Sequence, residues 1–174
     1  MTCSNPIVFA LFALLLAGCG SMPKTPELLI QNVKGGSMFS EQDVFEVKRP
    51  VTEVSEVLKN KAHECLKQKV SSTSNTGGPG IQLMRTDVRA FTPKVVVGKQ
   101  RARLTLQTKV IEGSTELGDI PPDGWYMMVV DAYSVDSRTT RVETYFQQPG
   151  YRGAFTAIKL WATGKNMGCP DLTK

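Results

Sequence analysis

The only histidine of the chain, His63, is the first residue to consider for catalysis, because histidine is the usual general base near neutral pH. Helical spacing places it between Ala62 and Glu64, beside the main apolar stripe of its predicted helix and not on it. We therefore interpret His63 as a partly exposed surface residue. The sequence contains neither a nucleophile elbow nor a His–Glu pair at the spacing of a metal site.

Paired carboxylates are the other groups that could act as acid and base, and they would suit cleavage of a glycoside or of peptidoglycan. Such a pair meets only in the folded chain, so sequence spacing does not identify it. We predict a protein with no enzymatic activity, no cofactor and no bound metal. The carboxylate candidates, none distinguished from the others, are Asp119, Asp123, Asp131 and Asp136.

A cysteine near the N-terminus has a characteristic setting. Cys19 follows Leu16, Ala17 and Gly18, directly behind the apolar run Ile7–Leu16. That run is far shorter than the roughly 20 residues that a helix needs to cross a bilayer, and it fits the apolar region of a signal peptide. The Leu-Ala-Gly-Cys motif in this position resembles the lipobox of bacterial lipoproteins. The resemblance implies export, acylation of Cys19 and cleavage just before it.

The same resemblance implies a location. Several lipid chains on one cysteine would anchor the protein stably, since each buried methylene contributes about 0.8 kcal/mol. In lipoproteins of this class an aspartate after the cysteine tends to retain the protein in the inner membrane; Gly20 stands there in this chain, which favours the outer membrane and a domain facing the periplasm. We expect a signal peptide over 1–18, the lipidated cysteine and a flexible tether over 19–43, and one globular domain over 44–174. Export also disfavours nucleic acid as a partner.

Two cysteines remain, because Cys3 would leave with the signal peptide and Cys19 would be lipidated. In the oxidising periplasm that the resemblance implies, Cys65 and Cys169 most simply form a disulfide. Two distant thiols and His63 do not supply a zinc site. The bridge would close a loop of about 105 residues, which corresponds to roughly 4–5 kcal/mol by the chain-entropy argument.

Hydrophobic periodicity predicts an α+β domain. Apolar residues at three- and four-residue spacing predict a helix over Val51–Val70, and alternation over Gln100–Ile111 predicts a strand with one packed and one solvated face. Trp125–Val135 is more continuously apolar, so we expect it to be central or covered on both faces. The other expected elements are a strand over Val44–Lys48, a loop over Ser71–Gly80, strands over Ile81–Phe91 and Thr139–Phe146, and a helix from Tyr151 to Ala162 capped by Gly164, while Leu28–Ile30 is left open between a short strand and a segment packed on the domain.

This order of elements predicts an antiparallel sheet of about four to five strands, with an N-terminal and a C-terminal helix packed on one face. The outline is similar to helix-grip folds, in which a curved sheet wraps a C-terminal helix. A likeness of topology does not fix a function.

The net charge of +5 belongs entirely to the chain after residue 19. Many of the basic residues fall on two or three predicted strands. They would either present a cationic surface to lipid A phosphates, anionic phospholipid or an acidic protein, or solvate the open face and discourage edge-to-edge pairing. We favour the second interpretation. The residues are Arg85, Arg89, Lys94, Lys99, Arg101, Arg103 and Lys109.

The long loop Glu112–Gly124 contains several glycines and prolines and leads into Trp125 and Tyr126. Long loops that end in aromatic residues often contact ligands or partners. Equally, these two aromatic residues could open a core strand, with the prolines stiffening the turn. The sequence leaves both interpretations open.

These observations predict a non-enzymatic, outer-membrane-anchored lipoprotein that binds or assembles with another envelope component, either a protein or an anionic constituent. A first alternative is a carrier or sensor that holds an apolar ligand between the sheet and the C-terminal helix. That alternative predicts a cavity lined by Met127, Met128, Phe155 and Trp161. A second alternative is a cell-wall enzyme with two converging carboxylates.

Overall fold

The computed structural model describes residues 22–75, 84–113, 120–147 and 152–172. The lipobox with Cys19, the aspartate Asp119 and the end of the expected loop at Gly80 lie outside these residues. None of the helices in the described ranges has the length and apolar character needed to cross a membrane.

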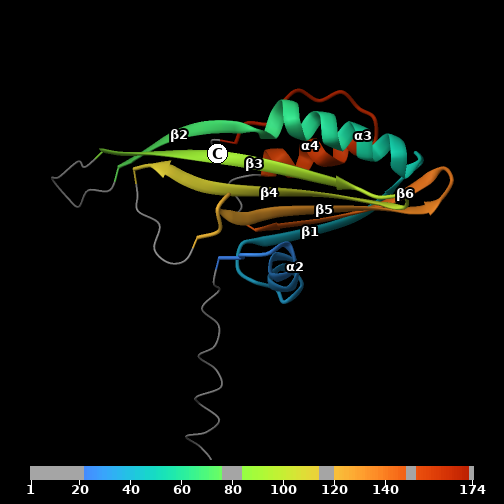
Figure 1. Ribbon diagram of the computed structural model, residues 1–174, viewed down its shortest axis with the longest axis horizontal. Coiled ribbons are helices and arrows are strands. Elements are labelled where there is room, and N and C mark those ends of the chain that lie inside the picture. Colours follow the sequence, from blue (N-terminus) through green and yellow to red (C-terminus); the bar gives the residue numbers. More distant parts are fainter. Residues whose placement is uncertain (1–21, 76–83, 114–119, 148–151, 173–174) are drawn as a thin grey trace, which may run out of the picture.

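One curled antiparallel sheet forms the centre of the fold (Figure 1). Within the described residues it has six strands, whereas the sequence predicted four to five, and the α+β class is confirmed. Strands that follow one another from β2 to β6 are neighbours, while β1 pairs with β6, so the sheet order is β1-β6-β5-β4-β3-β2. The strands are β1 (Ser40–Val47), β2 (Gln68–Asn75), β3 (Met84–Val97), β4 (Arg101–Glu112), β5 (Trp125–Asp136) and β6 (Thr139–Gln147).

Strand β2 is one of the elements that the sequence analysis missed. Its residues were expected to be the end of a helix and a flexible loop, because Ser71–Asn75 contains no apolar side chain. In the structure β2 pairs with β3 from Gln68 opposite Phe91 to Asn75 opposite Met84. Backbone hydrogen bonds do not require apolar side chains, so a polar segment can join a ladder when its neighbour supplies the partners.

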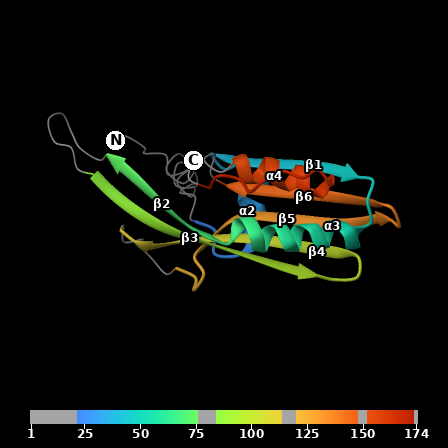
Figure 2. The ribbon, with the colours of Figure 1, turned by 90° about the horizontal axis from the view of Figure 1, so that it is seen from above.

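Two helices lie together on one face of the sheet (Figures 1 and 2). Helix α3 (Val51–Lys61) carries the chain from β1 at one edge towards β2 at the other, and a π-helical turn (Ala62–Leu66) continues it directly. Helix α4 (Arg152–Ala162) packs beside α3, and the main core lies between these helices and the sheet. Gly164 follows α4 with a φ of 81°, the left-handed conformation expected of its cap.

A third helix, α2 (Pro26–Lys34), lies within the segment that was expected to be a tether. The Thr25 Oγ1 accepts a hydrogen bond from the Leu28 amide at 3.1 Å, and Pro26 occupies the first turn, where its missing N–H is no loss. Leu29 is fully buried against Val129 and Tyr145. The tether prediction is therefore wrong for α2, since its apolar side chains fill a second hydrophobic cluster.

Helix α2 covers the sheet face opposite to α3 and α4 (Figure 1). Alternation along β5 shows this, because Val129 contacts the α2 cluster while Met128 and Val130 belong to the main core. The face of β4 that was expected to be solvated is consequently part of the interior, and Thr105 and Gln107 are buried there. Strand β5 is central and covered on both faces, as the sequence predicted.

The disulfide between Cys65 and Cys169 is confirmed. Its two Cα atoms lie 4.8 Å apart, and Cys65 is buried inside the π turn. The bridge ties the tail after α4 to the end of the first helical segment. The Trp161 indole N–H donates to the Met167 carbonyl at 3.0 Å and holds the same tail to α4.

Loss of the bridge should destabilise the fold substantially. We expect Cys169→Ala to lower the free energy of unfolding by about 4 kcal/mol, because the closed loop of 104 residues restricts the unfolded chain. Urea unfolding with and without reductant measures this. Reductant should lower the stability of the wild type to that of the variant and leave the variant unchanged; a variant as stable as the oxidised wild type would contradict the prediction.

Candidate functional site

The basic residues of the sheet do not form one surface. Arg89 pairs with Val110 and Ala90 pairs with Lys109, so Arg89 and Lys109 lie on opposite faces. Alternation puts Arg85 with Arg89, on the face that α3 and α4 occupy. Four others lie on the α2 face and one, Lys99, lies in the β3–β4 turn. The four on the α2 face are Lys94, Arg101, Arg103 and Lys109.

Two of those arginines are bound to one buried carboxylate. Arg103 makes a bidentate pair with Asp131, with Nε at 2.7 Å from Oδ1 and Nη2 at 2.8 Å from Oδ2. Arg101 adds a third hydrogen bond from Nη2 to Oδ1 at 3.0 Å. Asp131 is only 1% exposed, so its charge is compensated by these donors and not by water.

Electrostatics keep this cluster ionised. Burial by itself raises the pKa of Asp131, but the hydrogen bonds from Arg103 and Arg101 outweigh burial and hold the pKa below its ordinary value. The hydrogen bond to Asp131 raises the pKa of Arg103. The cluster is therefore a permanent ion pair near neutral pH and has no proton to exchange in that range.

Helix α2 joins the same cluster. The Glu27 Oε1 accepts a hydrogen bond from Arg103 Nη1 at 2.6 Å, so Arg103 bridges Asp131 on β5 and Glu27 on α2. Sequence reasoning named Arg103 and Asp131 but did not pair them, and it did not single out Glu27. The Thr25-Pro26-Glu27 sequence, a cap followed by proline and an acid, was the available signal for the helix that supplies Glu27.

Other predicted cationic residues also have partners. Arg85 Nε lies 3.4 Å from Asp87 Oδ1 on the same face of β3. Lys109 Nζ donates to the Pro122 carbonyl at 3.4 Å. These contacts agree with the interpretation that the basic residues serve the sheet itself, and they leave less free positive charge than the sequence implies.

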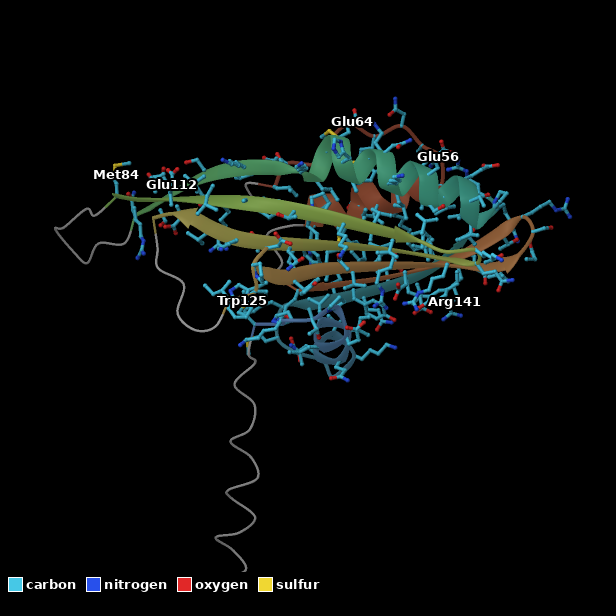
Figure 3. All side chains as sticks on the ribbon, in the orientation of Figure 1. Glu56, Glu64, Met84, Glu112, Trp125 and Arg141 are labelled. Carbon is cyan, nitrogen blue, oxygen red and sulfur yellow. A yellow bond between two sulfur atoms is a disulfide. The ribbon has the colours of Figure 1, made fainter. Side chains whose placement is uncertain are left out.

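The aromatic pair at the start of β5 is covered by the N-terminal segment. Trp125 is 8% exposed, and Lys24 Nζ lies 5.9 Å from the centre of its ring. The Tyr126 amide donates to the Pro23 carbonyl at 3.0 Å. Trp125 and Tyr126 therefore act in packing, and the segment before α2 seals them (Figure 3 labels Trp125 beneath the sheet).

The aspartates named as catalytic candidates have unlike settings. Asp131 is bound by two arginines, and Asp136 accepts a hydrogen bond from the Arg138 amide at 2.7 Å in the β5–β6 turn. Asp123 is exposed in the turn before β5. His63 is exposed in the π turn, in agreement with its interpretation as a surface residue.

The space proposed for an apolar ligand contains packed side chains. Met127, Met128 and Trp161 are buried members of the main core. Phe155 packs against that core, with its ring centre 6.5 Å from the ring centre of Phe146. The four residues expected to line a ligand cavity therefore pack against other side chains of the main core.

The sheet extends beyond its helices at one end, where β2 and β3 project furthest and the end of β4 pairs with Val88 (Figures 1 and 2). We call this projection the β2–β3 arm and define it as Ser71–Asn75 paired with Met84–Val88. All five arm residues of β2 are exposed, and Met84 is 73% exposed. Figure 3 places Met84 at the end of the arm, far from Trp125. The arm contributes backbone pairs to the fold but buries little apolar surface.

No protein-family model matches the chain, and no curated protein matches it.

The Asp131 cluster predicts acid-sensitive stability. Because folding lowers the pKa of Asp131, its stabilising contribution is complete above the unfolded pKa of about 3.9 and is lost as pH falls below that value. We expect Asp131→Asn to lower the free energy of unfolding at pH 7 by about 2–3 kcal/mol. Urea unfolding at pH 7 and pH 3 measures both effects.

The control for this prediction is Glu27→Gln. Its carboxylate is 65% exposed, so its loss should cost less than about 1 kcal/mol at pH 7. Asp131→Asn should also lose less stability than the wild type between pH 5 and pH 3. Equal losses in the wild type and Asp131→Asn would show that other carboxylates carry the acid sensitivity.

Proposed function

We propose that the chain is an outer-membrane-anchored periplasmic lipoprotein that acts as a non-enzymatic binding or assembly subunit of the cell envelope. The β2–β3 arm is the observation that carries the binding role. An isolated two-stranded hairpin is at most marginally stable in water, so an arm that buries little of its own surface is best explained by a partner that covers it. The lipobox Leu16–Cys19 supports the anchor.

The edge of the sheet favours a protein as the partner. Strand β2 is an edge strand, so the backbone N–H and C=O groups on its outer side have no strand beside them in the described sheet. Exposed edges are usually protected by charges, prolines or bulges, and β2 carries one charged residue, Lys69, and no proline. An extended segment of a partner protein could add to this edge through main-chain hydrogen bonds.

The position of Met22 supports anchoring of the folded domain close to the membrane surface. Met22 lies three residues after Cys19, and three residues span at most about 11 Å. Met22 and Pro23 contact the region of Trp125 and Tyr126. A lipid on Cys19 would therefore hold the α2 side of the domain next to the membrane, with α3 and α4 turned towards the periplasm.

The packing of the core weighs against a carrier of an apolar ligand, and the lining of the surface grooves weighs against a cell-wall enzyme. Side chains fill the region between the sheet and α4 that a carrier would use. Among the described residues, the groove between α3 and β3 has no carboxylate in its lining, and the cleft beside the β5–β6 turn has a single one, that of Asp136. A glycosidase of either stereochemical class requires two carboxylates across a cleft.

Lipid anchoring predicts that Cys19→Ala releases the protein from membranes, because acylation needs the thiol. Membrane fractionation and labelling with a palmitate analogue measure the effect. Cys3→Ala is the matched control, since Cys3 precedes the cleavage position and should not affect either readout. Unchanged fractionation and labelling of Cys19→Ala would contradict the anchor.

The binding role predicts contacts from the arm. A photoreactive p-benzoylphenylalanine in place of Thr73, an exposed arm residue, should crosslink the full-length protein to a specific envelope protein in cells. The same amino acid in place of Glu56, an exposed residue of α3 (Figure 3), is the control and should not capture that partner. The absence of a product at Thr73, or the same products from both positions, would argue against the arm as the binding element.

A further inference from the structure

A groove with a volume of about 450 Å³ lies between the end of α3 and the second half of β3. It is on the helix-covered face, opposite to α2, where Figure 2 shows β3 running beside α3. Ligand pockets in proteins have volumes of this order and combine apolar walls with a few convergent polar groups. The groove is separate from the Asp131 cluster and is not part of the β2–β3 arm.

Three groups that can carry positive charge line this groove: Lys59, His63 and Lys67. None of their side chains forms a hydrogen bond or ion pair with another described residue. Glu64 is next to His63 in sequence, but its carboxylate is bound by Lys61 at 2.9 Å, and neither of those two residues lines the groove. The groove thus brings together three solvent-exposed groups that have no partner among the described residues.

The π turn brings these residues into line. Lys59, His63 and Lys67 recur every four residues, and a regular α-helix of 3.6 residues per turn would rotate such a row steadily around its axis. The π turn Ala62–Leu66 lies within the row, and its i→i+5 hydrogen bonds give a longer repeat that reduces this rotation. Such turns are rare and are frequent at functional sites. The disulfide at Cys65 fixes the turn to the C-terminal tail.

The opposite wall is apolar because of where β2 begins. The first β2 residue, Gln68, pairs with Phe91, so the β3 residues after Phe91 have no strand on that side. Pro93 fits there, since its missing N–H costs no ladder bond at a free edge. Pro93 and Val95 from β3 and Ala62 from the π turn supply the apolar part of the groove.

We propose that this groove binds a small organic anion, a carboxylate or phosphate that carries an apolar group. The anionic group is held by Lys59, His63 and Lys67, and the apolar group lies against Ala62, Pro93 and Val95. Charge complementarity selects the anion, and the mixed lining distinguishes it from an inorganic ion, which would leave the apolar wall uncovered. The site goes beyond the proposed function and does not depend on the lipid anchor or on the arm.

Photolabelling of the full-length protein in its own membranes tests the site. The probe is 4-benzoylbenzoate, which has a carboxylate and an apolar photoreactive group, and mass spectrometry maps the labelled residues. We expect labels within residues 59–67 and 92–95, and competition by benzoate, by phenyl phosphate or by both. Competition by one compound alone identifies a carboxylate or a phosphate as the preferred group.

Charge variants separate a specific site from general attraction. Lys59→Met and Lys67→Met should each lower the labelling yield about threefold, and the double variant about tenfold, as expected for ion pairs with exposed lysines. Lys69→Met removes the same charge from an exposed lysine that does not line the groove, and it should leave labelling unchanged. Neutral benzophenone should label the groove weakly and without dependence on the lysines.

Three results would overturn the site. These are labels that map outside residues 59–67 and 92–95, an undiminished yield in the double variant, and failure of both benzoate and phenyl phosphate to compete. Urea unfolding of the double variant is the control for folding: a midpoint equal to that of the wild type means that a lower labelling yield comes from the lost charges. Because the readout is a label position, it is independent of the fractionation and crosslinking that test the proposed function.

Discussion

The burial of β5 on both faces is the constraint on which the rest of the structure depends. Six consecutive residues, Met127–Ala132, are each at most 2% exposed. A strand covered in this way needs a layer on each side, which α3 and α4 supply on one face and α2 on the other. The run contains one charged residue, Asp131, and a buried carboxylate requires donors of opposite charge. Arg103 and Arg101 on the neighbouring strand meet that requirement, and Glu27 then links α2 to the same cluster.

The helical layer depends on a second constraint, the disulfide between Cys65 and Cys169. The bridge lies at the π turn, where α3 ends and the chain enters β2 at the edge of the sheet. The bridge also holds the C-terminal tail against the π turn. The geometry of this junction also determines the groove, since β2 begins opposite Phe91 and leaves the remainder of β3 beside the π turn without a strand neighbour. One covalent link thus stabilises both the packing of α3 with the tail and the walls of the proposed anion site.

The three surfaces of interest face different directions. In the proposed arrangement the α2 side lies next to the membrane, because only two residues lie between Cys19 and the packed segment that begins at Met22. The groove is on the opposite face of the sheet, and the β2–β3 arm projects from the end of the sheet (Figure 1). A partner strand added to β2 would therefore compete neither with the membrane nor with a ligand in the groove.

The sequence by itself determined the features that rest on local pattern. Apolar spacing identified α3, α4 and the strands β3 to β6, continuous hydrophobicity placed Trp125–Val135 at the centre of the sheet, and the cysteine count predicted the Cys65–Cys169 bridge.

Only the tertiary structure decided the features that depend on partners distant in sequence. Strand β2 has no apolar pattern and exists because β3 supplies its hydrogen bonds. Helix α2 is short and lies among polar residues, glycines and prolines that predict a tether. It packs because Leu29 and Val33 cover the second face of β5 at Val129. The sequence grouped the basic residues on two or three strands, but the strand register divides them between two faces. Asp131 binds two of them, Arg101 and Arg103, because pairing across strands depends on the fold and not on order along the chain.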